Sequence, residues 1–165
     1  MPFDDFDDED FDHFDEDKLP DPLREALECP LHRKAREIAR LATALVESVG
    51  PEPASDEPTA GPLLEYTKSY LLENAYLLGA KLANACAGTD YGHRMEMAVL
   101  IKRAAVELLT QTSGLRAYAT VPGEYLDALR AEVEEFRLLF GPWVAAFDRT
   151  DFHDDGWGLF DRLLP

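Results

Sequence analysis

A short acidic motif near the C-terminus contains residues whose types and spacing suit cation binding. Asp151, His153 and Asp155 alternate along the chain before Gly156, as the first ligands of a calcium-binding loop do. The twelfth position of such a loop holds a bidentate glutamate, but here it is Arg162. An imidazole is also a poor ligand for a hard cation. We therefore treat Asp151, His153 and Asp155 as weak metal candidates and interpret the motif first as an acidic turn.

A second group of polar and aromatic residues lies on one predicted helix, around the margin of its apolar stripe. Its members are weak candidates for ligand binding: Tyr66, Tyr70, Asn74, Lys81 and Asn84. Polar groups at such a margin most often hydrogen-bond to a neighbouring helix or extend toward water. The alternative is a small pocket, with Asn74 and Lys81 beside the two tyrosines.

Motifs of the common catalytic sites are missing from the sequence. A di-iron site in a helical bundle needs Glu-x-x-His on two helices, yet no glutamate here has a histidine three residues later. The four histidines are scattered, with no spacing typical of zinc. No phosphate-binding glycine loop, dinucleotide fingerprint or nucleophile elbow occurs. We predict no catalytic residue and no cofactor, and we favour a protein that is not an enzyme, with an enzyme left open.

Four predicted helices would position these residues. The apolar residues of the segment 30–49 recur at spacings of three and four, which indicates an amphipathic helix. They are Leu31, Ala35, Ile38, Ala42, Leu45 and Val49. Similar patterns predict helices over residues 63–87, 93–113 and 123–148. Short turns make neighbouring helices antiparallel, so the sequence predicts an all-α, antiparallel four-helix bundle over residues 21–148.

Glycine and proline residues mark the predicted helix ends. Residues 50–62 contain four prolines and two glycines and must form a loop. Gly114 is expected to end the third helix, in the position where left-handed glycine is common. Gly141 and Pro142 fall inside the apolar pattern of the fourth helix, so we expect a kink there before the helix ends near Asp148.

The second and third predicted helices are apolar over more of their circumference than a bundle requires. A stripe of about 100° is enough to bury a helix on one core. The surplus needs a cover, for which a second subunit, the C-terminal segment and the long loop are the candidates. We favour a homodimer, because most soluble oligomers are symmetric homodimers.

The first twenty residues form a predicted acidic tail. Residues 1–17 contain eight Asp and two Glu with no Lys or Arg, and repulsion among these carboxylates opposes a packed core. Four aromatic side chains are spaced between the acids: Phe3, Phe6, Phe11 and Phe14. We predict that residues 1–20 are disordered. They are either a solubilising leader or a segment that docks in a basic, apolar groove of a partner protein.

Residues 149–165 form a predicted irregular C-terminal tail. Trp157 and Phe160 are among several large apolar side chains in it. These side chains are too many to leave in water, so we expect the tail to pack on the bundle or on a partner subunit.

The composition narrows the class of partner and the compartment. The formal net charge of −17 repels phosphate backbones and anionic lipid, so nucleic acid and membrane are poor partners, whereas a basic protein is a candidate. Only two cysteines occur, so no disulfide framework is implied. The acidic N-terminus is the reverse of a signal peptide, and no apolar run is long enough to span a bilayer. We expect a soluble, cytoplasmic protein.

The stretch Asn84-Ala85-Cys86-Ala87-Gly88 resembles the Asn-Ile-Ala-Glu-Gly end of the second helix in the bacterial four-helix-bundle family associated with 23S ribosomal RNA intervening sequences. Asn84 and Gly88 carry the match. The chain is also similar to uncharacterised bacterial proteins with a Met-Glu-rich third helix and a Trp-Gly-Leu-Phe tail, here Glu96 and residues 157–160. These resemblances imply a bacterial helical bundle without an established catalytic activity. Some relatives of the first family are basic oligomers that bind nucleic acid, and this acidic chain departs from them.

Taken together, the patterns favour a non-enzymatic helical-bundle interaction or scaffold module that forms a homodimer. A bundle that binds a small ligand or a metal, with an enzyme included, is the first alternative. A nucleic-acid-associated bundle, by family analogy, is the second.

Overall fold

The computed structural model describes residue 24 and residues 28–159. This part of the chain contains four long helices: α2 (Pro30–Ser48), α3 (Ala60–Ala87), α4 (Tyr91–Tyr118) and α5 (Gly123–Ala145). Its only β-type pairing is an isolated bridge between Pro53 and Ala119. The predicted all-α four-helix bundle is confirmed. The predicted disordered tail, residues 1–20, lies outside the described residues.

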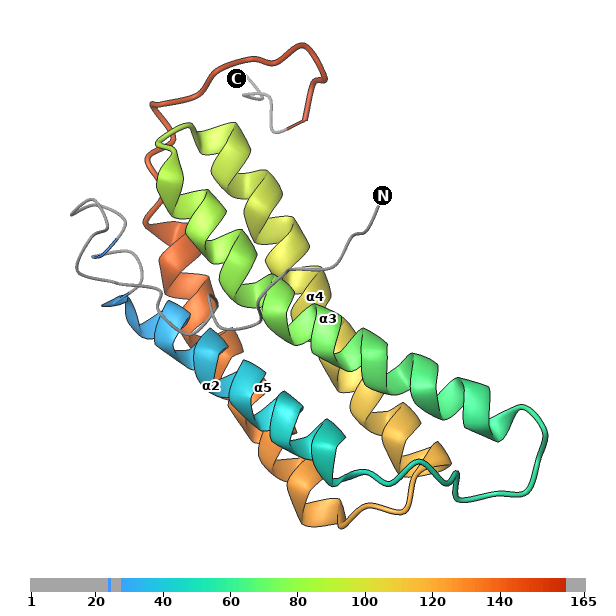
Figure 1. Ribbon diagram of the computed structural model, residues 1–165. Coiled ribbons are helices and arrows are strands. Elements are labelled where there is room, and N and C mark those ends of the chain that lie inside the picture. Colours follow the sequence, from blue (N-terminus) through green and yellow to red (C-terminus); the bar gives the residue numbers. More distant parts are fainter. Residues whose placement is uncertain (1–23, 25–27, 160–165) are drawn as a thin grey trace, which may run out of the picture.

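Successive helices run in opposite directions and lie side by side, and α5 returns beside α2 to close the ring (Figure 1). The loop between α2 and α3 passes the end of α4, where the Ala54 amide donates to the Tyr118 carbonyl at 2.9 Å. This contact and the bridge to Ala119 attach the loop to the end of the bundle. The chain is therefore a simple up-and-down bundle, in which each helix contacts its neighbours in sequence.

The helix starts are set by capping residues. Pro30 opens α2, where its missing N–H costs nothing, and the sulfur of Cys29 accepts from the His32 amide at 3.4 Å. Asp90 caps α4 by accepting from the His93 amide at 2.8 Å. The α3–α4 turn is correspondingly short, and it forces these two helices to pack antiparallel along their length.

The core is a leucine-rich seam running through all four helices. Every member of the predicted α2 stripe, from Leu31 to Val49, is buried. The largest fully buried side chains are Phe136, Ile38, Leu64, Leu71, Leu78, Leu82, Ile101, Leu108, Leu115, Leu126, Leu129 and Thr112. Burial of each large apolar side chain contributes about 1.5–3 kcal/mol, so this seam supplies most of the stability of the fold.

Gly114 does not end a helix, contrary to the sequence-based expectation. It lies inside α4, which continues to Tyr118. A Cβ at this position would lie 3.1 Å from the Thr67 methyl group of α3. The glycine therefore allows two helices to approach closely and does not supply a left-handed turn. The start of α3 was also predicted too late, because Pro62 is tolerated in the first turn of the helix.

The predicted end of α5 near residue 148 was also too late. Pro142 lies within the helix, as expected from the apolar pattern, but α5 ends at Ala145. Proline removes one backbone hydrogen bond, which weakens the last turn of the helix. The chain then leaves the helix axis, although Phe147 remains buried.

The C-terminal segment packs on the bundle only in part. After α5 the chain runs to the α3–α4 turn (Figure 1), where the Tyr91 amide donates to the Asp151 carbonyl at 2.6 Å. The ring of Phe152 lies edge-on to Tyr91, with ring centroids 6.4 Å apart. Trp157, by contrast, is 81% exposed and Leu159 is 57% exposed. Phe160 lies outside the described residues.

Among the helices of the described residues, none is both long and apolar enough to cross a membrane. The long helices α3 and α4 are interrupted by polar side chains at their margins.

Candidate functional site

The candidate interaction site is a groove of about 420 Å³ between α4 and α5, hereafter the α4–α5 groove. Its floor is apolar and continuous with the core, and is formed by Leu109, Val133, Phe136 and Phe140. On the α4 side Ala105 has only a methyl group, and on the α5 side Gly141 has no side chain. A Cβ built at Gly141 would meet nothing within 4 Å. The groove is open because each of the two helices lines it with a small residue, Ala105 on α4 and Gly141 on α5.

A row of aromatic rings backs the groove along α5. Phe136 and Phe140 have centroids 6.3 Å apart, and Phe140 lies 5.8 Å from Trp143. Trp143 meets Phe147 edge-on at 4.6 Å, and the Arg94 guanidinium of α4 lies 5.6 Å from the centre of the Phe147 ring. Aromatic contacts of this kind contribute about 0.5–1.5 kcal/mol each beyond burial. The row therefore gives the groove a rigid wall.

The rim of the groove carries charges of both signs. Lys102 lies on the α4 side, and Glu134 and Arg137 lie on the α5 side. The Nε of Arg137 donates to Glu134 at 2.8 Å. This hydrogen bond lowers the pKa of the Glu134 carboxyl below its ordinary value, so the pair is ionised at neutral pH. The rim can accept either sign of charge from a partner.

Large apolar side chains project beside the groove. Val106, which lines it, is 53% exposed, and Leu138 is 60% exposed one helical turn from Glu134. Val99 is similarly exposed two turns before Val106 on α4. The apolar surface thus extends beyond the groove on both helices, which is typical of a surface that meets another protein.

The predicted ligand-binding residues of α3 lie outside the grooves described for residues 28–159. Asn74 is buried, but its side-chain amide donates to the Tyr70 carbonyl of the same helix at 2.8 Å. The rings of Tyr66 and Tyr70 stack at 5.4 Å on the outside of the helix. Lys81 is half-buried and Asn84 is exposed. None of these five residues lines the α4–α5 groove or the hollow at the start of α4 described below.

The acidic residues near the C-terminus are used in turns. Asp155 accepts from the Trp157 amide at 2.9 Å, and Asp154 accepts from the Gly156 amide at 2.8 Å. The Asp151 carbonyl accepts from the Tyr91 amide, and the His153 amide donates to the Asp90 side chain, both at the start of α4. Within residues 28–159 no three His, Cys, Asp or Glu side chains are placed to hold a metal ion. The interpretation as an acidic turn agrees with this geometry.

The same segment does help to form a small hollow of about 210 Å³ at the start of α4. Asp90 lies at its centre, and the amides of His93 and His153 donate to its two oxygens at 2.8 and 2.7 Å. The His93 hydrogen bond is the main cause of a lowered pKa of Asp90, and the His153 bond adds to it. Asp90 therefore acts as a double cap that joins α4 to the C-terminal segment.

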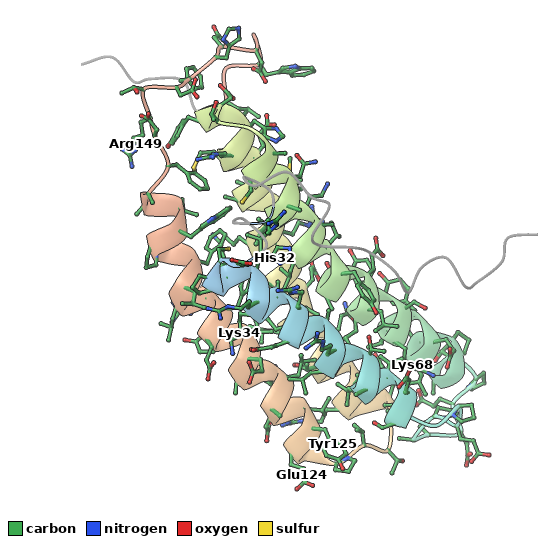
Figure 2. The ribbon with its side chains drawn as sticks, turned by 60° about the vertical axis from the view of Figure 1, so that its left-hand side comes forward. His32, Lys34, Lys68, Glu124, Tyr125 and Arg149 are labelled. Carbon is green, nitrogen blue, oxygen red and sulfur yellow. The ribbon has the colours of Figure 1, made fainter. Side chains whose placement is uncertain are left out.

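Lys34 connects α2 to α5 through three carboxylates. Its ammonium group lies 2.6 Å from Glu132, 2.7 Å from Glu135 and 2.7 Å from Glu37. Figure 2 shows Lys34 on the side of α2 that faces α5. The hydrogen bonds to Glu132 and Glu135 are the largest causes of a raised Lys34 pKa. This cluster, called the Lys34 clamp below, has a structural role.

The predicted interaction residues have different outcomes. Trp157 is exposed at the C-terminal end. The four tail phenylalanines lie outside the described residues: Phe3, Phe6, Phe11 and Phe14. The α4–α5 groove was missed, because Ala105 and Gly141 carry no chemical signal in the sequence. The surplus apolar surface of the third predicted helix, which includes Val99 and Val106, was the only indication.

Neither a protein-family model, nor a curated protein, nor a solved structure matches the chain. The resemblance at Asn84 and Gly88 to the intervening-sequence family therefore stays a prediction.

Proposed function

We propose that the protein is a non-enzymatic interaction module that forms a symmetric homodimer through the α4–α5 groove. The observation that carries this proposal is an exposed leucine, Leu138, on the same helix as the apolar groove and about one turn from two of its lining residues, Glu134 and Gly141. In a two-fold interface the same patch meets itself, so each patch must supply both the projecting side chain and its receptor. Leu138 of one copy would enter the groove of the other over Phe136 and Phe140.

The charges on the rim support the same arrangement. Glu134 and Arg137 lie next to each other on α5, with Lys102 opposite on α4. Under a two-fold rotation, Glu134 of one copy can approach Lys102 or Arg137 of the other. Complementary charges at the rim fix the register of an interface more than they add to its affinity. A partner of one charge sign would fit this rim less well than a second copy does.

The experiment is sedimentation equilibrium at about 10–100 μM, the range in which dimers with apolar cores commonly form. The wild-type chain is expected at twice its monomer mass of 18.5 kDa. Leu138→Glu should convert it to a monomer, because a charge cannot enter the apolar hole without a partner. Leu63→Glu, an exposed leucine at the start of α3, is the matched control and should leave the dimer intact. A monomeric wild type, or a dimer that survives Leu138→Glu, would contradict the proposal.

A small apolar ligand is the second candidate for the same groove. Its volume of about 420 Å³ lies in the range of small-molecule sites, and its floor is apolar. A ligand that binds the folded state raises the melting temperature in proportion to the logarithm of its concentration. A fragment screen followed by this titration distinguishes the two candidates, since a ligand in the groove would also compete with dimer formation.

A further inference from the structure

One cation at the rim of the α4–α5 groove has no charged partner within the described residues. Lys102 lines the groove from α4 and is exposed. No carboxylate of residues 28–159 lies within ion-pair distance of its ammonium group. Glu134 on the α5 side is already paired, since the Nε of Arg137 donates to it at 2.8 Å. The charge left over at the rim is therefore positive, although the whole chain has a formal net charge of −17.

The register of α4 against α5 locates this cation at one end of the groove. Arg130 of α5 donates to the Leu109 carbonyl of α4 at 3.0 Å. The two helices run in opposite directions (Figure 1), so an equal step back along α4 and forward along α5 brings Lys102 level with Arg137. That step is about two turns, or about 10 Å of helix. The apolar floor therefore extends about 10 Å from the cations toward Leu109 and Val133.

A cation at one end of an apolar groove fits a ligand with one anionic end and one apolar chain. The ammonium group of Lys102 can donate to a carboxylate, and such charge-assisted hydrogen bonds are roughly twice as strong as neutral ones. An alkyl chain on the floor removes apolar surface from water on both molecules. We propose that the α4–α5 groove binds a medium-chain alkyl carboxylate, with the carboxylate at Lys102 and the chain over Phe136 toward Leu109.

This inference rests on the proposed function, because a ligand in the groove would regulate the dimer by competition with Leu138 of the second copy. The ligand is small and contacts only the Lys102 end of the rim, whereas a second copy meets charges of both signs. Binding of the ligand itself requires only the open groove. The ligand and the dimer are therefore measured by separate readouts.

The test is a titration of the full chain with octanoate, whose extended chain is about as long as the groove. The methyl groups of leucine and valine are labelled with ¹³C and followed by NMR. Shifts are expected for Val106, Leu109 and Val133, which line the groove, while Leu64 and Leu82 of α3 should stay in place. Butanoate, hexanoate and octanoate should bind with increasing affinity, by roughly two- to four-fold for each methylene group.

Matched variants separate the charge of Lys102 from the apolar floor. Lys102→Gln should weaken octanoate binding about three-fold and leave the binding of octanol, which has the same chain without the charge, unchanged. Arg103→Gln removes the same charge from the next residue, which is exposed and does not line the groove, and should leave both ligands unchanged. Unchanged octanol binding also shows that the groove of each variant is intact.

Two results would overturn the proposal. Methyl shifts that are scattered over the protein, or that leave out Leu109 and Val133, would show that octanoate does not occupy the groove. Equal losses of octanoate affinity in Lys102→Gln and Arg103→Gln, or equal losses of octanoate and octanol in Lys102→Gln, would show that Lys102 does not hold the carboxylate.

Sedimentation equilibrium with and without octanoate keeps this result distinct from the dimer. If both proposals hold, octanoate lowers the average mass toward the monomer value of 18.5 kDa. A chain that is monomeric without octanoate, yet shows the groove shifts and their dependence on Lys102, would contradict the dimer and support the ligand. A dimer whose groove methyl groups do not respond to octanoate would contradict the ligand alone.

Discussion

Helix α4 has two flanks, and the bundle treats them differently. On one flank α3 packs against it closely, to the point that Gly114 of α4 leaves no free space for a Cβ beside Thr67 of α3. On the other flank α5 leaves the α4–α5 groove, with Val106 half-exposed at its edge. Both flanks are apolar. The difference shows that burial of an apolar face within one chain depends on what the neighbouring helix presents, and a face left unfilled is available for another molecule.

The cause lies in the partners of α4. Helix α3 presents leucines along its inner face, including Leu64, Leu71 and Leu78, which fill the seam with α4. Helix α5 lines this side with Phe136 and Phe140, but it also presents Gly141 and the charged pair of Glu134 and Arg137 there. The Lys34 clamp secures α5 from its other side, through α2. The bundle thus tolerates an incomplete seam because α5 is attached elsewhere.

The largest effect on the α4–α5 side of the core is expected from removal of the Phe136 ring. Phe136 is 1% exposed and lies under the groove, so Phe136→Ala is expected to cost about 3–5 kcal/mol of unfolding free energy. Urea denaturation at concentrations too low for the proposed dimer to form measures this loss. Leu138→Ala, on the exposed side of the same helix, is the control and should change stability by less than about 0.5 kcal/mol. A similar loss for both variants would mean that the groove is closed in solution.

The close packing of α3 against α4 can be tested where Gly114 meets Thr67. Gly114→Ala adds a methyl group 3.1 Å from the Thr67 methyl group. Thr67 cannot move aside freely, because it is buried and its hydroxyl donates to the Leu63 carbonyl at 2.7 Å. We expect a loss of about 1–3 kcal/mol, larger than the gain in helix propensity.

A double-mutant cycle sharpens this prediction. Thr67→Ser removes the methyl group that the added Cβ would meet and keeps the hydroxyl. The pair Gly114→Ala with Thr67→Ser should therefore recover much of the loss, with a coupling energy of at least about 0.5 kcal/mol. Strictly additive effects of the two substitutions on the free energy of unfolding would show that the seam is looser than described.

The Lys34 clamp predicts a pH dependence. The hydrogen bond from Lys34 lowers the pKa of the Glu37 carboxyl in the folded protein. Ionised Glu37 therefore stabilises the fold at pH values above the unfolded pKa of about 4.3. This stabilisation is lost as the pH falls through the lowered pKa of the folded state. The pKa of Lys34 is raised above its ordinary value of 10.5. The stabilisation of the fold by charged Lys34 is therefore complete below pH 10.5 and is lost only at more alkaline pH. The clamp is therefore fully formed around neutral pH.

Lys34→Met should lower the melting temperature by roughly 3 °C at pH 7. The difference from the wild type should shrink as the pH falls through the lowered pKa of Glu37, where this carboxylate takes up a proton. Thermal melts at several pH values check this, with Lys68→Met as a control that removes an i,i+3 pair on α3. A constant difference between about pH 3 and pH 7 would contradict the electrostatic account of the clamp.

The smallest change in the free energy of unfolding is expected for Gly123→Ala, which is the comparison for Gly114→Ala. Gly123 opens α5, and a Cβ there would meet nothing within 4 Å. Gly123→Ala should stabilise the protein by a few tenths of a kcal/mol up to about 1 kcal/mol, because it restricts the unfolded chain without adding a contact. Destabilisation measured by the same urea titration would show that the start of α5 is not helical in solution.

The sequence predicted a helix well where the residues of that one segment determine its position and its buried face. The spacing from Leu31 to Val49 identifies α2 because burial on one face follows directly from a period of 3.6 residues. Gly114 was misjudged because its neighbour, Thr67, belongs to another helix, and local rules treat glycine as a terminator. The end of α5 was misjudged because the apolar pattern continues to Phe147 after the helix has ended.

The candidate site was less predictable for the same reason. A groove is defined by two helices together, and small residues such as Ala105 and Gly141 become informative only when the packing of α4 against α5 is known. Asn74 shows a third outcome, since its margin position predicted a hydrogen bond to a neighbouring helix or extension toward water, and its side-chain amide instead donates to the Tyr70 carbonyl of its own helix. Sequence pattern alone does not choose between these two hydrogen bonds.

The aromatic row along α5 has a consequence for spectroscopy. Trp143 and Trp157 are the two tryptophans of the chain, one placed between Phe140 and Phe147 and the other 81% exposed. Their fluorescence should differ in colour and in access to a soluble quencher such as acrylamide. Replacement of Trp157 by Phe would leave one emitter that touches a ring of the α4–α5 groove. The protein then reports occupation of that groove optically, without any added label.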